Sequence, residues 1–475
     1  MREATHQPGA SPDDTGPAGT AVDEVGRRRE QWAWCWYDWA NSVFPTSIIT
    51  VFLSLYLTSV AEQDALASGQ PCRGSNALVG CDISLFGLQF PAGSLWGYLL
   101  AVSTALQVLV LPLTGAIADR TQNKRRMLAL FAFTGAAATG LLALVADANW
   151  LLGAVLFLAA NVGYGASVIV YYSVLPDIAT PDERDGLSSL GWAFGYLGGG
   201  TVLALHLAIY LGREALGLTE PEAVRVCFLT AGVWWAVFTV IPLSRLHRHR
   251  PAQGTEQGLA VLTAGFRQLG STLREARAYP LTLGFLAAYL IYTDGITTVA
   301  DVAGLYGERE LGLARSTLIT TILLVQFVAF LGALLHGRVA RRFGAKRTIM
   351  GSLVGWIAVV GAAYFIQRGD QLQFYAVAMG IGLVLGGTNA LSRSLFSQLV
   401  PPGREAEYFS VYEVGEKATS TLGPLLFAAV GQATGSFRPA IVSLVVFFVI
   451  GFVLVSLVPV RRAIRAAGNP EPAVV

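Results

Sequence analysis

Long apolar runs separated by short polar segments are the feature that most limits how this 475-residue chain can fold. A helix needs about 20 predominantly apolar residues to cross the hydrocarbon core of a bilayer. Only 13% of the residues are charged, about half the share found in soluble domains, and 53% are hydrophobic. The sequence therefore predicts an all-α integral membrane protein. Its twelve transmembrane helices are expected at residues 32–58, 94–115, 127–147, 150–174, 187–211, 225–243, 280–303, 315–336, 348–367, 371–392, 408–431 and 438–458.

The segments outside these runs are too short to form a sizeable soluble domain. Residues 1–26 are rich in Pro, Gly, Ala and Asp and contain no apolar run, a composition typical of a disordered tail. The expected organisation is a cytoplasmic tail (1–26), an N-terminal six-helix bundle (27–244), a cytoplasmic linker (245–279), a C-terminal six-helix bundle (280–460) and a second cytoplasmic tail (461–475).

The basic residues gather in alternate loops, although the net charge of +2 is too small to indicate a nucleic-acid partner. Cytoplasmic loops of membrane proteins carry an excess of Lys and Arg, so this asymmetry predicts that both termini are cytoplasmic. Nearly all the cations are arginines, a bias typical of GC-rich coding that favours a bacterial plasma membrane. The loops assigned to the cytoplasm hold Arg27–Arg29, Arg120, Lys124–Arg126, Arg245, Arg248, Arg250, Arg338, Arg341, Arg342, Lys346, Arg347, Arg461, Arg462 and Arg465.

The second half of the chain repeats features of the first half. The sequence GAIADRTQNKRRM, which begins at Gly115, matches GRVARRFGAKRTI, which begins 222 residues later at Gly337. At the same offset PDERDGLSS, around Asp185, matches GREAEYFSV, around Glu407, and WYDWANS resembles IYTDGITT. Together these matches predict a six-plus-six repeat. Transporters built from two such halves bind their substrate between them, near the bilayer midplane.

The loop G-x-x-x-D-R-x-x-x-[K/R]-[K/R] that begins at Gly115 resembles the signature of the major facilitator superfamily. It departs from that signature at Asn123, where a glycine is usual, and its second copy has Arg341 in place of the acid. The sequences YDWANS, SSLGWAFGYLGGG, SRSLFSQLVP and EYFSVYEVGEKATSTLGPLLF resemble the branch that contains fungal autophagy-related vacuolar amino-acid effluxers and bacterial relatives. The resemblance extends from Arg27 to Arg462 and implies a major facilitator fold and amino-acid efflux by alternating access.

Two predicted helices carry polar stripes along one face. A carboxylate near the bilayer core is strongly unfavourable unless it is solvated or paired, so both stripes are expected to line a substrate or proton path. For Asp38, which lies among tryptophans near the predicted cytoplasmic interface, a solvated, helix-capping or gating role is the alternative. The stripes comprise Asp38, Asn41 and Ser42 in the first helix, and Asp294, Thr297, Thr298 and Asp301 in the seventh.

The eleventh predicted helix contains Glu413, Glu416 and Lys417. Glu413 and Lys417 are four residues apart with the glutamate first, the favourable order for an ion pair on a helix. One interpretation is a self-neutralised structural cluster. The other is a site for a zwitterion, in which Lys417 binds a carboxylate and Glu413 or Asp294 binds an ammonium group.

The loop after the second predicted helix is expected to act as a conformational gate. Its acid could hold the end of a neighbouring helix while its basic residues bind anionic head groups, and the alternative is a role in topology alone. A separate expectation is a disulfide between Cys72 and Cys81 in the first outer loop. The predicted gating residues are Gly115, Asp119, Arg120, Lys124, Arg125 and Arg126.

Several other functions find no support in the sequence. It contains no nucleotide-binding G-x-x-x-x-G-K-[S/T] motif, no nucleophile–base constellation and no set of metal ligands, so we expect neither an enzyme nor a bound cofactor. Transport is expected to be secondary or facilitated, with the bilayer, a small solute and protons as partners, in a monomer. The alternatives are a drug, sugar or organic-acid exporter and a membrane sensor that does not transport.

Overall fold

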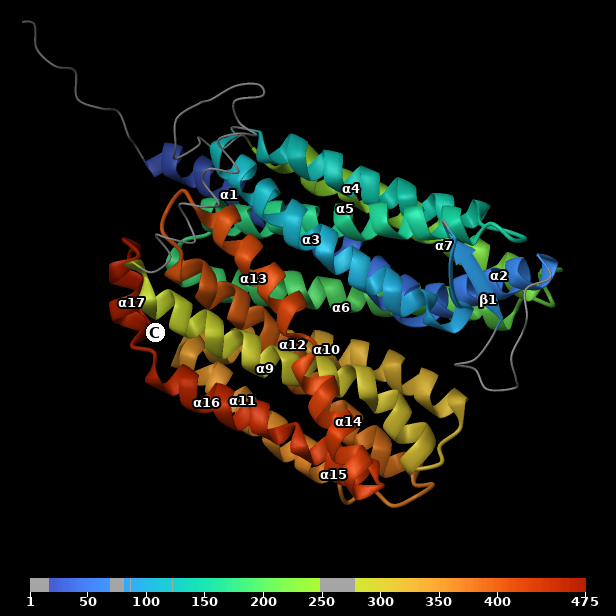
Figure 1. Cartoon of the computed structure of the whole chain (residues 1–475). Helices are drawn as coiled ribbons and strands as arrows, with labels where there is room; N and C mark the ends of the chain where they lie inside the picture. The colour runs from blue at the N-terminus through green and yellow to red at the C-terminus, as the bar shows by residue number, and fades with distance from the viewer. Residues whose placement is uncertain (1–16, 69–80, 86, 122, 248–277) are drawn as a thin grey trace, which may run out of the picture.

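A computed structural model of the chain describes residues 17–68, 81–85, 87–121, 123–247 and 278–475. The helices run roughly alongside one another in two groups, one built from the N-terminal half of the chain and one from the C-terminal half (Figure 1). The N-terminal half contains α1 (Pro17–Asn41), the π-helical segment η1 (Phe44–Leu53), α2 (Ser54–Ala67), α3 (Leu95–Arg120), α4 (Lys124–Leu141), α5 (Trp150–Ile178), α6 (Pro181–Leu211) and α7 (Glu220–Arg245).

The C-terminal half repeats this arrangement, and two of its helical stretches are each divided into two shorter helices. It contains α9 (Pro280–Leu305), η5 (Tyr306–Glu310), α10 (Arg315–Phe343), α11 (Ala345–Ala363), α12 (Gln371–Leu399), α13 (Glu405–Thr419), α14 (Leu422–Thr434), α15 (Phe437–Ser443), α16 (Val445–Leu457) and α17 (Val460–Ala466).

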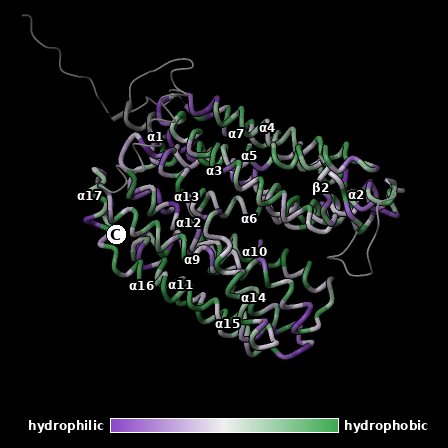
Figure 2. The backbone as a smooth tube through the Cα atoms, in the orientation of Figure 1, coloured by the Kyte–Doolittle hydropathy of each residue, from purple (hydrophilic) through white to green (hydrophobic). Residues whose placement is uncertain are grey.

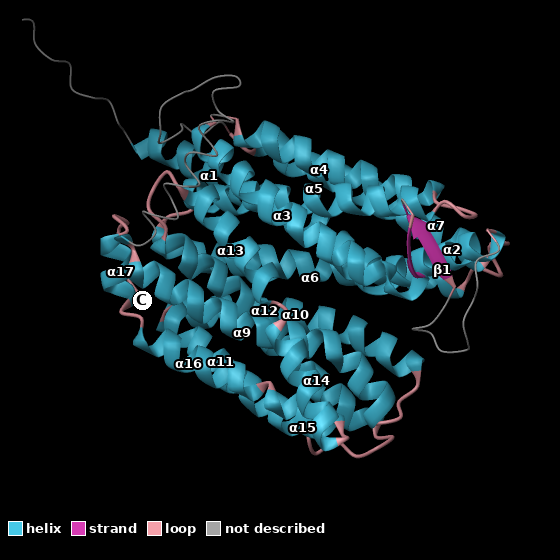
Figure 3. Cartoon of the chain, in the orientation of Figure 1, coloured by secondary structure: helices cyan, strands magenta, loops and turns pink. Residues whose placement is uncertain are grey.

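The two ends of the molecule are easily told apart. One end carries Thr121, Asn123 and Gly344, the short loops 179–180 and 400–404, and α17, and we call it the basic end. The other end carries a two-stranded antiparallel hairpin, β1 (Asp82–Leu85) and β2 (Leu88–Pro91), and we call it the hairpin end (Figure 3). Hydrophobic residues cover most of the length of the helices, while hydrophilic residues gather toward the two ends (Figure 2). This distribution fits helices that cross a bilayer.

Ten helical stretches among the described residues are long and apolar enough to cross a membrane. Two predicted segments are not among them. The segment 348–367 coincides with α11, which has 19 residues, and 408–431 coincides with α13 and α14, which are separated by an interruption. The structure therefore supports an all-α membrane fold, and the count of twelve spans stays a prediction.

Polar residues fix where two of the long helices begin. Thr180 at the start of α6 and Thr219 at the start of α7 each form a capping box, with Glu183 and Glu222 respectively. In a capping box the threonine side chain accepts from one backbone N–H and the glutamate accepts from another, which satisfies donors that the helix cannot pair internally. Residues that read as loop in the sequence therefore fix where these two helices begin.

The predicted bundle boundaries differ from the structure at both ends of the chain. Helix α1 begins at Pro17, ahead of the predicted boundary at Arg27, and Arg28 and Glu24 form an i,i+4 ion pair of 2.7 Å within it. Such pairs extend helices into polar sequence, which the composition of the tail did not reveal. The C-terminal tail contains α17. Residues 248–277 of the predicted linker and Cys72 of the predicted disulfide lie outside the described residues, so the bridge to Cys81 stays a prediction.

The two halves meet through pairs of helices that the sequence repeat relates. Helix α3 packs against α13, and α10 packs against α6. A methyl group at Gly115 would lie 2.5 Å from the Ala406 carbonyl oxygen, and one at Gly337 would lie 2.6 Å from Ser189 Cβ. The two glycines that align in the repeat therefore permit close helix crossings between the halves.

Candidate functional site

Arg393 of α12 inserts into the N-terminal half at the basic end, and its side chain is fully buried. Its Nη1 lies 3.2 Å from Asp38 Oδ2 on α1. Its Nε donates to Ser188 Oγ on α6 at 2.9 Å, and its Nη2 donates to the Ser188 carbonyl oxygen at 2.8 Å. One arginine thus joins the C-terminal half to two helices of the N-terminal half.

Aromatic rings of the N-terminal half surround the guanidinium group of Arg393. The guanidinium carbon lies 4.8 Å from the centre of the Tyr172 ring and 4.9 Å from that of Trp34, with Tyr171 and Trp192 at 5.6 and 5.5 Å. Ring faces attract a cation, and the attraction grows when water is excluded. This cage therefore helps to stabilise a charge that has left water.

Asp38 faces this interface, and neither lipid nor open solvent surrounds it. Its side chain is 13% exposed, and Oδ2 also accepts a hydrogen bond of 2.7 Å from Tyr171 Oη. Glycines of α6 let α1 approach closely, because a methyl group at Gly191 would lie 2.7 Å from Asp38 Oδ2 and one at Gly195 would lie 2.9 Å from Ser42 Oγ. Asp38 thus points toward the other half of the molecule, and its partner Arg393 was not predicted from the sequence.

Further hydrogen bonds join the halves at the same end. Ser188 Oγ donates to the Ala390 carbonyl oxygen at 2.6 Å, Ser394 Oγ donates to Asp185 Oδ1 at 2.5 Å, and Arg184 donates to the Ser397 carbonyl oxygen at 3.1 Å. Further toward the hairpin end, Gln326 of α10 donates to Thr46 Oγ1 at 3.4 Å. The described polar contacts between the halves thus gather at the basic end, while α10 also packs on the N-terminal half through Ile319, Ile322 and Leu323.

The predicted gating loop contributes to this closure through Asp119. Its two carboxylate oxygens accept hydrogen bonds from the backbone N–H groups of Ala406 and Glu407, at 2.9 and 2.8 Å, in the first turn of α13. An acid in this position pairs otherwise unsatisfied donors and interacts favourably with the helix dipole. Asp119 on α3 of the N-terminal half therefore binds the start of α13 in the C-terminal half.

The other predicted gating residues differ in their contacts and exposure. Lys124 forms a 2.9 Å ion pair with Asp177 on α5 and donates to the Ser173 carbonyl oxygen at 3.0 Å, both in its own half. Arg125 and Arg126 are exposed, and Arg120 is half-buried. Gly115 and Asp119 contact α13 directly, and Lys124 lies within electrostatic range of Glu405 on the same helix.

The polar stripe on the seventh predicted helix contacts α14, whereas Asp38 contacts Arg393 at the interface between the halves. Asp294 is 2% exposed, and its Oδ2 accepts a hydrogen bond of 2.8 Å from the Gly423 N–H at the start of α14. Thr297 donates to the Thr293 carbonyl oxygen of its own helix, and Asp301 is exposed. Among the described residues no hydrogen bond or ion pair joins this stripe to the first helix. In the described state α14 covers Asp294, and a path lined by both stripes stays a prediction.

The charged cluster of α13 lies near the interface but is paired differently from the prediction. In the described part of the chain Glu413 and Lys417 form no ion pair with each other. Glu416 accepts a 2.5 Å hydrogen bond from Tyr289 Oη, and Glu413, 8% exposed, lies within electrostatic range of Arg393. Lys417 also acts on Asp301. Because several opposite charges compete for each side chain, helical spacing alone did not decide the pairing.

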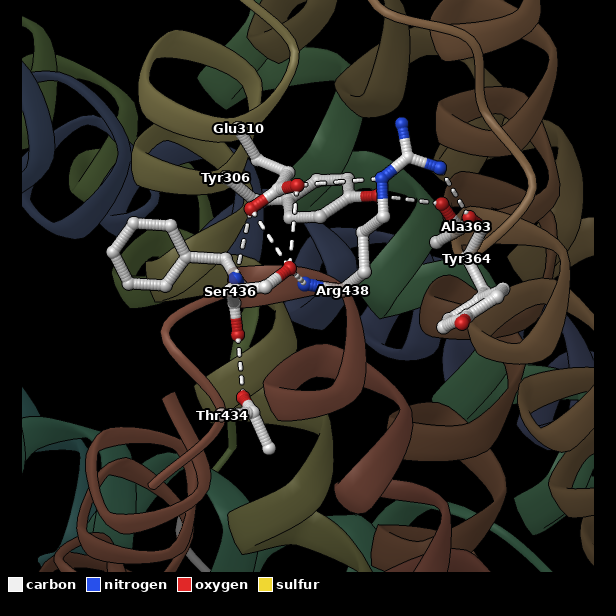
Figure 4. Close-up of polar contacts among 8 residues, drawn as sticks. Tyr306, Glu310, Ala363, Tyr364, Thr434, Ser436 and Arg438 are labelled. Carbon is white, nitrogen blue, oxygen red and sulfur yellow. Dashed lines mark hydrogen bonds and ion pairs between the residues drawn. The ribbon is translucent and has the colours of Figure 1, made fainter. Parts of the chain in front are cut away.

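A second ionic cluster occurs at the hairpin end, within the C-terminal half (Figure 4). Arg438 lies 3.3 Å from Glu310 and donates to the Tyr364 carbonyl oxygen at 2.8 Å, while Glu310 accepts from the Phe437 N–H at 2.8 Å. These contacts join the ends of α9, α11 and α15. All of them lie in one half, so this cluster has a structural role and is not part of the path between the halves.

The sequence-based predictions missed Arg393. It lies in the run SRSLF, one residue beyond the predicted end of the tenth helix at 392, whereas α12 extends to Leu399. An ionisable residue inside a membrane-spanning helix indicates function by default, so a longer predicted helix would have marked Arg393 as a candidate. What the sequence does not show is its partner, because Asp38 is 355 positions away.

Comparison with known proteins agrees with this architecture. The family described as "Vacuole effluxer Atg22 like" matches residues 26–468. The uncharacterized MFS-type transporter YxiO of Bacillus subtilis is 30% identical, over 91% of this chain and 95% of its own length. Autophagy-related protein 22-2 of Emericella nidulans is 28% identical, over 95% and 92% respectively.

Solved structures show the same fold at low sequence identity. The human organic anion transporter MFSD10 superposes with a TM-score of 0.62 at 14% identity, over 90% of this chain and 99% of that one. The proton:xylose symporter XylE superposes with a TM-score of 0.65 at 12% identity, over 93% and 96%. The fold is thus the all-α membrane fold of the major facilitator superfamily, and the chain belongs to the Atg22-like effluxer family within that superfamily of transporters.

Proposed function

We propose that this transporter exports amino acids by alternating access of a site between its two halves. The observation that carries the proposal is the buried contact between Arg393 of one half and Asp38 of the other. A buried ion pair contributes little net stability compared with apolar packing, and the best supported use of such pairs is in switches and registers. A lock that forms in one state and breaks in another is such a use.

The lock supports a cycle in which the two halves rock against each other. In the described state the contacts of Arg393, Asp119 and Ser188 close the basic end, so solute would reach the centre from the hairpin end. Opening the basic end requires Arg393 to leave its cage and α13 to leave Asp119. Positive charge at the basic end supports placing it in the cytoplasm of a bacterial cell, with export across the plasma membrane.

The α13 cluster supports a zwitterionic substrate. Lys417 and Glu413 are not paired with each other, both lie on the helix that contacts the N-terminal half, and neither is fully exposed. Lys417 would bind the carboxylate of an amino acid and Glu413 its ammonium group. Asp294 is covered by the start of α14, where Gly423 donates to its Oδ2, so Glu413 is the acid proposed for this role. The effluxer description of the matching family agrees with this direction of transport.

Counterflow into proteoliposomes tests the substrate class. Vesicles loaded with one amino acid should accumulate the same amino acid in labelled form. Vesicles loaded with a sugar, an organic acid or a cationic drug should not accumulate the corresponding labelled solute. We expect Lys417→Met and Glu413→Gln to abolish counterflow, and Arg368→Met, which removes an exposed cation at the hairpin end, to leave it unchanged. Uptake of the sugar, organic acid or drug alone, or full activity of Lys417→Met, would contradict the proposal.

A further inference from the structure

The interruption between α13 and α14 lies beside an unpaired carboxylate oxygen in the interior of the C-terminal half. Asp294 Oδ2 accepts from Gly423, but in the described part of the chain Asp294 Oδ1 has no partner. The hydroxyl of Thr298, one helical turn further along α9 and 1% exposed, also has none. Buried polar atoms are rarely left without partners, so each such atom requires an explanation.

The unpaired groups surround one point, the first turn of α14. A methyl group at Gly423 would collide with Thr298 Oγ1 and would lie 3.2 Å from the Asp294 carbonyl oxygen. Asp294 and Thr298 are four residues apart on α9 and therefore share a face. The carboxylate, the hydroxyl and the start of α14 thus form one small polar cluster within apolar surroundings.

The neighbouring helices supply no positive charge to this cluster. Helices α14 and α16, which pack against α9, contain no charged residue. The remaining charged groups on α9 and on elements packed against it make no hydrogen bond or ion pair with Asp294. They are Asp301 on α9, Arg393 on α12, Glu405, Glu407, Glu413, Glu416 and Lys417 on α13, Glu308, Arg309 and Glu310 on η5, and Arg461, Arg462 and Arg465 on α17.

The charge of the cluster indicates its ligand. A buried carboxylate without a cationic partner is strongly unfavourable, so the site favours an occupant that brings positive charge. One carboxylate balances one positive charge. The described residues contain no group of three or more acids, histidines and cysteines that could hold a metal ion, which disfavours a divalent cation here.

The cluster also lies where α13 and α14 part. Helix α13 packs against α3 and α5 of the N-terminal half, whereas α14 packs against α9 and α15 of the C-terminal half. Asp294 holds the first turn of α14 in place. A change in the charge of Asp294 would therefore act at the joint between a segment docked on one half and a segment fixed in the other.

We propose that Asp294 Oδ1 and Thr298 Oγ1 bind one monovalent cation, a proton or an alkali metal ion, and that its binding sets the bend between α13 and α14. Coupling of this cation to amino-acid export rests on the proposed function, whereas the binding site itself does not. Interrupted helices in other transporters supply ion sites at equivalent breaks, where the backbone is free to contribute.

Thermal unfolding of the purified full-length protein in detergent, with no amino acid present, tests the site. The midpoint is measured across a pH series, and in sodium chloride against choline chloride at equal ionic strength. We expect the wild type to gain stability either as pH falls, which identifies a proton, or with sodium, which identifies an alkali ion. Asp294→Asn should lose that response, and Glu214→Gln, which removes an exposed carboxylate of the N-terminal half, should keep it.

A second variant keeps the test decisive if Asp294→Asn does not fold. Thr298→Val preserves shape and removes one hydroxyl, and it should move the half-maximal cation activity by about tenfold. Identical responses of wild type and Asp294→Asn, or an unchanged half-maximal activity in Thr298→Val, would overturn the site. Failure of amino-acid counterflow would leave these responses intact, so the two proposals fail separately.

Discussion

Arg393 shows how one side chain can connect two halves of a membrane protein. Three of its donors reach Asp38 and Ser188, and four aromatic rings surround its guanidinium group. Lysine could not replace it, because a single ammonium group cannot reach both partners and also stack on rings. The charge is tolerated only while its partners stay in place, which is the property that a lock between two states needs.

Replacing one member of the Asp38–Arg393 pair should lower the stability of the protein more than replacing both. Asp38→Asn or Arg393→Met alone leaves a buried charge uncompensated, which costs about 3–5 kcal/mol. The double variant removes both charges and should recover much of that loss. The thermal midpoints of the wild type, the two single variants and the double variant in detergent provide a double-mutant cycle. Equal and additive losses would show that the two residues do not interact.

Space around the pair is as important as charge. Gly191→Ala should lower stability and weaken the lock, because its methyl group would lie 2.7 Å from Asp38 Oδ2 and 3.0 Å from Arg393 Nη2. Gly186→Ala on the same helix is the matched control, since no atom lies within 4 Å of its added methyl group. It should gain up to about 1 kcal/mol of stability from helix propensity. The thermal midpoints of both variants check this, and similar shifts would contradict the packing argument.

The residue scale also shows what sequence can reveal. The charge in an apolar run marks Asp38 as a candidate, because a bilayer penalises it, whereas Arg393 lies just beyond the predicted end of the tenth helix. Their pairing depends on how α1, α6 and α12 cross, which no local pattern encodes. Asp294 illustrates a second limit, since its contact with α14 depends on a break in the eleventh predicted helix, which was taken as one unbroken span.

At the scale of elements, the interruption of the eleventh predicted helix has a local cause. Pro424 lacks the N–H that would bond the Ser420 carbonyl oxygen, and it disfavours helical backbone at the residue before it. The preceding Thr419, Ser420 and Thr421 prefer helix ends over helix interiors. The sequence TSTLGP therefore contained the signal for the break, but total hydropathy over 408–431 concealed it.

The capping of α13 by Asp119 predicts an effect on rate. Asp119→Ala should lose about 1 kcal/mol of stability and slow transport without changing the order of preferred substrates, because the cap holds only one of the two states. Asp370→Ala is the control, since Asp370 caps α12 within its own half by accepting from Gln373 at 3.0 Å. It should lose similar stability with little change in rate. Counterflow rates normalised to inserted protein make the comparison, and equal slowing in both variants would argue against a gate.

At the scale of the whole molecule, the repeat predicted the architecture better than it predicted the site. Gly115 and Gly337 align in the sequence, and each permits a close crossing between the halves. The repeat fixes which helices correspond, and the apolar runs fix where they lie. The asymmetric features, such as Arg393 in one half and Asp38 in the other, are absent from any symmetric pattern and required the structure.

The central claim is that the two halves rock about a site closed by the Asp38–Arg393 pair. Pulsed electron resonance distances between spin labels at exposed positions test it directly, in protein whose buried Cys35 and Cys227 are replaced by alanine. Labels at Arg125 and Arg341 report the basic end, and labels at Leu216 and Phe365 report the hairpin end. In the double variant Asp38→Asn with Arg393→Met, the basic-end distance should lengthen while the hairpin-end distance shortens. Unchanged distances, or distances that lengthen together, would contradict the account.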